Sequence, residues 1–111
     1  MGPYKLNKDQ LRQGDVFFVR VASLPPDAEK VDTHGGRLVI AHGEATGHVH
    51  AFEFHDGELY RTAGGAQFVN VIREGAQLLH DEHSAVTFPK GIWKRAFQTE
   101  YSPQALRTVA D

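Results

Sequence analysis

Glu58-Leu-Tyr-Arg-Thr-Ala-Gly-Gly-Ala-Gln-Phe-Val-Asn-Val-Ile72 is the stretch that sets the predicted fold class. Its two halves, Glu58–Thr62 and Gln67–Ile72, carry β-branched and aromatic residues that are typical of strands. Gly64-Gly65 between them favours a tight turn, because glycine readily adopts the left-handed backbone conformations that such turns need. The stretch therefore predicts a β-hairpin.

Short apolar segments separated by glycine and proline turns recur on both sides of this hairpin. This pattern is typical of a small β domain. Asp56-Gly57 is expected to form a second hairpin turn. Besides a weaker segment over 30–33, the pattern predicts further strands at Val16–Val21, Arg37–His42, His48–His55, Gln77–His80, Val86–Phe88 and Ile92–Tyr101.

The strands alternate with short loops, and we see no linker between domains. We expect an all-β fold, a small antiparallel barrel or roll of about eight short strands, in a single domain over residues 1–111. Two short helical segments are expected at the ends. Asn7 is placed to cap a helical turn over Lys8–Gln13, and Ser102-Pro103 to start a short C-terminal helix over Gln104–Val109.

Composition narrows the classes of function. The chain of 111 residues is 41% hydrophobic, which is enough for a modest core, and its net charge of −2 provides no general basic field for nucleic acid. The absence of cysteine excludes disulfides, thiolate metal sites and cysteine nucleophiles. No apolar run resembles a signal peptide or approaches membrane-spanning length, so we expect a soluble, cytoplasmic protein.

Histidines gather in two short stretches. His42-Gly-Glu-Ala-Thr-Gly-His48-Val-His50 and His80-Asp-Glu-His83 hold five of the seven histidines of the chain. Neutral imidazole is the commonest protein metal ligand and is suited to proton transfer near neutral pH. The two stretches therefore predict a functional site.

Strand pairing gives the first stretch a predicted geometry. If Arg37–His42 and His48–His55 form a hairpin around Gly43–Gly47, His42 lies opposite His48 and Ile40 opposite His50. A one-residue slip would turn these histidines to the other face. In this register one face carries Leu38, Ile40, His42, His48, His50, Phe52 and Phe54.

We interpret this face as a metal site next to a substrate pocket. His42, His48 and His50 are the expected ligands of a divalent ion, Zn²⁺ or Fe²⁺ above all, and Phe52 and Phe54 the expected floor of a pocket for a small polar substrate. Three further residues are expected to complete the site: His80 and His83, paired across a two-residue turn as an extra ligand or as proton-transfer groups, and Glu44 as an acid–base group.

The spacing of His48, His50, Glu53 and Gly57, with Gly43 before them, resembles the first metal-binding motif of the cupin family. The resemblance implies a cupin-like β-barrel. Thr87-Phe-Pro-Lys-Gly91 is similar to the turn of the second cupin motif, although no histidine follows it. The segment from His80 to Tyr101 also resembles the C-terminal part of small uncharacterised bacterial proteins.

Two other hypotheses fit the same residues. In the first, the histidines act as general base and general acid in cleaving or binding RNA, without a metal. The contacts to RNA would then come from Lys90, Trp93, Lys94 and Arg95. The opposing interpretation of this segment is an amphipathic strand that buries Trp93.

In the second hypothesis the protein is a non-catalytic binding or assembly module, and its histidines are structural groups that hydrogen-bond one another. Exposed edge strands favour pairing of two copies in either case, so a homodimer is expected.

Overall fold

The computed structural model describes residues 8–42 and 49–96. They form an all-β fold with one short 3₁₀ helix, and no α-helix occurs among them. The strands are β1 (Gln10–Gln13), β2 (Val16–Val21), β3 (Glu29–Lys30), β4 (Leu38–His42), β5 (Val49–Phe52), β6 (Gly57–Arg61), β7 (Gln67–Val71), β8 (Ala76–His80), β9 (His83–Phe88) and β10 (Gly91–Ala96), and the 3₁₀ helix is η1 (Phe54–Asp56). None of the described residues belongs to a helix long and apolar enough to cross a membrane.

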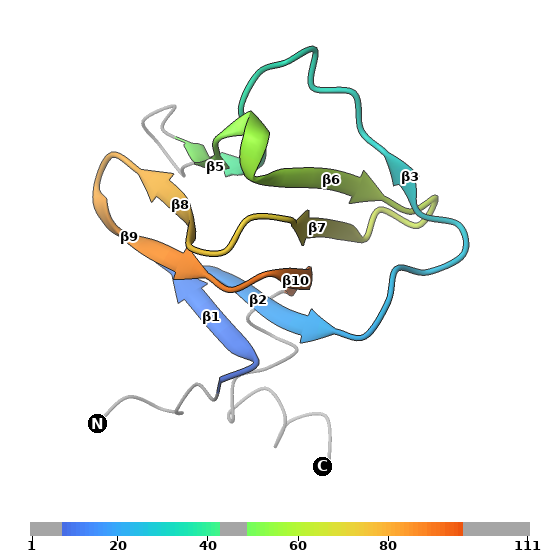
Figure 1. Ribbon diagram of the computed structural model, residues 1–111, viewed down its shortest axis with the longest axis horizontal. Helices are drawn as coiled ribbons and strands as arrows, with labels where there is room; N and C mark the ends of the chain where they lie inside the picture. The colour runs from blue at the N-terminus through green and yellow to red at the C-terminus, as the bar shows by residue number, and fades with distance from the viewer. Residues whose placement is uncertain (1–7, 43–48, 97–111) are drawn as a thin grey trace.

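The strands form two antiparallel sheets (Figure 1). The six-stranded sheet has the order β1-β2-β10-β7-β6-β3, and the four-stranded sheet the order β4-β5-β8-β9. β1 at the edge of the first sheet lies beside β9 at the edge of the second. The all-β prediction is confirmed, but the described strands form two open sheets and no closed barrel.

One hydrophobic core joins the sheets, with buried side chains from eight of the strands. Phe88 of β9 lies at its centre. Its ring makes edge-on contacts with Phe18, Phe52 and Trp93 at centroid distances of 5.0, 4.9 and 5.1 Å. Such T-shaped pairs are favoured because the positive edge of one ring meets the negative face of another. These aromatic contacts fix the two sheets against each other.

The hairpin over residues 58–72 is confirmed, since Leu59 pairs with Val69 and Tyr60 with Phe68. The helical turn predicted over Lys8–Gln13 is wrong. This segment contains β1, which pairs with β2 around Gly14. Strand pairing with a buried neighbour outweighs a weak local helix signal.

The hairpin turn predicted at Asp56-Gly57 is also wrong. β5 pairs with β4 and β8, whereas β6 pairs with β3 and β7, so the chain passes through η1 from one sheet to the other. A Cβ atom at Gly57 would lie 2.5 Å from the carbonyl oxygen of Asn70, so glycine allows this close approach. The helix predicted over Gln104–Val109 lies outside the described residues.

Candidate functional site

Three imidazoles meet at the ends of β5, β8 and β9. Ala51 of β5 pairs with Leu79 of β8, and His80 pairs with His83 across a two-residue turn. The ring centroid of His50 lies 4.3 Å from that of His80 and 5.9 Å from that of His83. The ring centroids of His80 and His83 are 4.6 Å apart. The predicted pairing of His80 with His83 is therefore confirmed. We call His50, His80 and His83 the histidine cluster.

Gln13, at the end of β1, holds His50 in place. Its Nε2 donates to the carbonyl oxygens of Leu78 and Ser84, both at 2.9 Å. Its Oε1 lies 2.9 Å from Nδ1 of His50. Both side chains are buried, at 2% exposure each. Because an amide oxygen only accepts hydrogen bonds, Nδ1 of His50 carries the hydrogen.

His50 is uncharged at neutral pH. Its pKa is lowered to about 4 by burial first and then by the neighbouring His80, His83 and Arg95, against a smaller opposing effect of the Asp15 carboxylate. With the hydrogen on Nδ1, Nε2 is left as an unprotonated nitrogen. This is the form of imidazole that binds a metal or accepts a proton.

His80 has the opposite hydrogen arrangement. Its Nδ1 accepts a hydrogen bond of 3.0 Å from the backbone N–H of Glu82, inside the β8–β9 turn. The hydrogen of neutral His80 is therefore on Nε2. The His50–His80 pair thus combines one unprotonated Nε2 with one protonated Nε2.

His83 packs against the β1–β2 turn. Gly14 has a φ of +61°, and a Cβ atom built there would lie 2.7 Å from Nε2 of His83. Glycine at this position both suits the left-handed backbone and leaves room for the ring. The end of β1 and the following turn therefore form one wall of the histidine cluster.

The rings of His50 and His83 are stacked, with an interplanar angle of 18°, whereas the ring of His80 is tilted by 37° to that of His50 and by 49° to that of His83. Among the residues that the structure describes, no group of three or more His, Cys, Asp or Glu side chains is arranged to hold a metal ion. Glu53, the counterpart of the cupin glutamate, is exposed beside η1.

The comparisons with known proteins identify a family. The sequence matches the profile of a domain of unknown function, DUF8820, over residues 12–98. The chain belongs to the DUF8820 family. No curated protein and no solved structure matches it. The matched range includes Gln13 and the whole histidine cluster of this DUF8820 domain.

The predicted ligands of the DUF8820 domain are only partly described. His48 and Glu44 lie outside the described residues, and for His42 the structure gives the backbone alone. The expected register of β4 with β5 holds where Leu38 pairs with Phe52. It then shifts at a bulge between Val39 and Ala41. His42 therefore pairs with Val49, and Ala41 with His50, so the predicted pairing of His42 with His48 is wrong.

Phe52 and Phe54 do not share a pocket floor. Phe52 is buried in the core at 1% exposure, whereas Phe54 is 54% exposed in η1. β5 ends at Phe52, so the strand alternation that would have placed both rings on one face does not continue. The predicted substrate pocket is therefore not formed by these two residues.

The segment predicted to contact nucleic acid includes β10, a partly buried strand between β2 and β7. Trp93 is fully buried, its Nε1 donates to the carbonyl oxygen of Pro89 at 3.2 Å, and the Arg20 guanidinium lies 4.9 Å from its ring. No face of Trp93 is open for a base to stack on. Lys90 is exposed, and Lys94 and Arg95 are half-buried. Nη1 of Arg95 donates to the Ile40 carbonyl oxygen at 3.5 Å.

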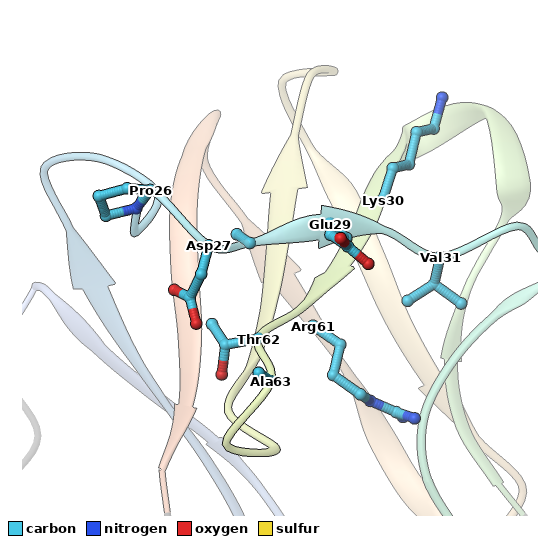
Figure 2. A pocket seen from close by; sticks show the side chains of 9 residues that line it. Pro26, Asp27, Glu29, Lys30, Val31, Arg61, Thr62 and Ala63 are labelled. Atoms are coloured by element: carbon cyan, nitrogen blue, oxygen red, sulfur yellow. The ribbon is translucent and has the colours of Figure 1, made fainter.

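A hollow of about 460 Å³ lies beneath β3, lined by residues 26–31 and 61–63 (Figure 2). In Figure 2, Lys30 points away from the side chains of Asp27, Arg61 and Thr62. β3 lies on the far side of the fold from the β8–β9 turn (Figure 1). The hollow therefore has no part in the histidine cluster.

Sequence reasoning missed Gln13 and Gly14. The segment 8–13 has no apolar alternation, and Gln13 contacts Leu78 and Ser84 at separations of 65 and 71 residues. The positive φ of Gly14 could have been inferred from its place between two strands. Its contact with His83 could not.

Proposed function

We propose that this DUF8820 protein binds a divalent transition metal ion, Zn²⁺ or Fe²⁺, at the histidine cluster, with Nε2 of His50 as the fixed ligand. One observation carries the proposal: Gln13 occupies Nδ1 of His50, so Nε2 stays unprotonated beside two more imidazoles. Metal-binding histidines commonly donate their other ring N–H to an oxygen acceptor in this way.

The spacing of His80 and His83 supports a shared ion. Imidazoles that bind one Zn²⁺ at about 2.0–2.1 Å have ring centroids roughly 4.5–5.2 Å apart. Of the three separations in the cluster, that of His80 and His83, 4.6 Å, lies within this range, whereas His50 lies slightly closer to His80, at 4.3 Å, and farther from His83, at 5.9 Å. The proposal requires a rotamer change of His80, which is half-buried, and of His83, which is exposed, to bring their nitrogens toward Nε2 of His50. Ligation through Nδ1 of His80 would replace its hydrogen bond from Glu82.

The sequence-predicted ligands remain part of the proposal. His42 and His48 are candidates for the other coordination positions, as the cupin resemblance implies, and Glu44 for an acid–base role. A bound metal would supply an activated water or a polarising charge to a small polar substrate. Any histidine of the cluster that is not a ligand would transfer a proton. The cytoplasmic location and the homodimer also stay predictions.

A second candidate is acid–base chemistry without a metal, including cleavage of RNA. Its support is the tilted ring contact of His50 and His80, 4.3 Å between centroids, with opposite hydrogen positions and beside the positive charge of Arg95. A neutral base and a proton donor on adjacent rings are what such chemistry needs. Because Trp93 is buried, RNA contacts would come from Lys90, Lys94 and Arg95 alone.

Elemental analysis of protein purified without chelator or histidine tag separates the two candidates. We expect near-stoichiometric metal in the parent, loss of metal in His50→Ala, and parental metal content in His55→Ala, a control histidine outside the cluster. Retention of metal in His42→Ala/His48→Ala would assign the ligands to the histidine cluster, and its loss would assign them to the predicted set. A parent that stays metal-free after incubation with Zn²⁺, Fe²⁺, Mn²⁺ and Ni²⁺ contradicts the metal proposal.

A further inference from the structure

We infer that Gln13 is a positioning residue, which fixes the hydrogen of His50 on Nδ1 and makes Nε2 the working nitrogen of the site. The inference rests on hydrogen-bond geometry. It holds whether Nε2 binds a metal or accepts a proton, so it deepens the proposed function without depending on the metal.

The orientation of the Gln13 amide follows from its partners. Its NH₂ group faces two carbonyl oxygens, those of Leu78 and Ser84, and uses one hydrogen for each. Rotating the amide by half a turn would place Oε1 against both carbonyl oxygens, so that both bonds from Nε2 would be lost and three acceptor oxygens would face one another. Burying unsatisfied polar groups is costly, and both Gln13 and His50 are buried. The observed orientation is therefore held by the backbone of β8 and β9.

The orientation of the amide decides the tautomer of His50. Oε1 of Gln13 has lone pairs only, so a contact of 2.9 Å with Nδ1 requires a hydrogen on Nδ1. The backbone of β8 and β9 thus sets the amide, and the amide sets the ring. A side chain that only joined the sheets would need the two Nε2 bonds and no contact with His50.

Substitutions of Gln13 separate its two roles, which are joining the strands through Nε2 and accepting a hydrogen bond from His50 through Oε1. Glutamate keeps an acceptor for Nδ1 but loses the donors to Leu78 and Ser84. Methionine has a similar length and loses the donors and the strong acceptor together. Gln77→Met is a matched control, because Gln77 is exposed on β8. Only the loss of the acceptor should alter the tautomer of His50.

Long-range proton–nitrogen NMR of ¹⁵N-labelled, metal-free protein at pH 8, where free histidine is neutral, tests the inference. We expect a protonated Nδ1 and an unprotonated Nε2 at His50 in the parent, in Gln13→Glu and in Gln77→Met. In Gln13→Met we expect a mixture of both tautomers. Where Zn²⁺ binds, this variant should also lose affinity by about 10–100-fold.

Two results would overturn the inference: a parent His50 that carries its hydrogen on Nε2, or a folded Gln13→Met variant with the parental spectrum. If Gln13→Met does not fold, the parent spectrum alone still decides whether Nδ1 is protonated, and the comparison of Gln13→Glu with Gln77→Met decides whether the acceptor suffices. If Zn²⁺ binds none of the proteins, the metal proposal fails while the tautomer result stands.

Discussion

Oε1 of Gln13 lies 2.9 Å from Nδ1 of His50, where the edge of the six-stranded sheet meets the four-stranded sheet. Gln13 is 37 residues from His50 in the chain and 71 from Ser84, so this contact depends on the complete fold. It connects the packing of the sheets to the protonation of one imidazole. The stability of the fold and the chemistry of the cluster should therefore respond together.

Stability should fall in mild acid because of His50. Its pKa in the folded protein, about 4, is below the 6.5 of free histidine, so between these values the unfolded chain binds a proton that the folded chain does not. The contribution of neutral His50 to the free energy of unfolding is therefore fully present above pH 6.5 and is lost as the pH falls toward 4. Between pH 7 and 5 we expect His50 to remove about 2 kcal/mol of unfolding free energy.

Urea unfolding at pH 7 and pH 5 measures this loss. In His50→Ala the loss of unfolding free energy that His50 causes between pH 7 and pH 5 should disappear, while His55→Ala should show the same loss as the parent. The groups that influence the pKa of His50, which are Asp15, His80, His83 and Arg95, remain in both variants. Equal pH dependence of the parent and His50→Ala would contradict the burial of a neutral His50.

Gly14→Ala should displace His83. An alanine at φ +61° costs about 1–2 kcal/mol, and its Cβ would meet Nε2 of His83 at 2.7 Å. Gly35→Ala is the matched control, because its φ is +76° and nothing lies within 4 Å of its Cβ position. Both variants should lose similar stability in thermal unfolding. Only Gly14→Ala should shift the NMR signals of His83, and an unchanged His83 would show that the turn is not a wall of the cluster.

Trp93 should behave as a buried core residue. It is the only tryptophan and has 0% exposure, so iodide should quench its fluorescence far less in the folded protein than in urea. Addition of single-stranded RNA should leave the emission unchanged, even if Lys90 and Lys94 contact phosphates. Quenching by iodide to the level of the unfolded chain would revive the interpretation of Trp93 as a base-stacking platform.

Local patterns predicted the features that depend on neighbouring residues. The hairpin around Gly64-Gly65 and the pairing of His80 with His83 both follow from turns of a few residues. In each case the turn and the apolar pattern agree, so the sequence specifies one pairing.

Features that depend on distant contacts were not predictable in this way. The bulge between Val39 and Ala41 moves His42 opposite Val49, although the amino-acid sequence of the strand carries no glycine or proline that would mark it. β1 forms because β2 offers a partner, and its own residues carry little strand signal. The contact of Gln13 with His50 arises only when both sheets are in place. These long-range contacts explain why the sequence predicted histidines of the site and missed the residue that orients one of them.

Calorimetric titration of Zn²⁺ into the parent and two double variants tests the proposed function most directly. His80→Ala/His83→Ala removes two members of the histidine cluster, and His34→Ala/His55→Ala removes two histidines outside it. We predict that the parent and His34→Ala/His55→Ala bind about one Zn²⁺ per chain with the same affinity, while the cluster variant loses at least about 10-fold. Equal binding by both variants, or no binding by the parent, would contradict a metal site at His50, His80 and His83.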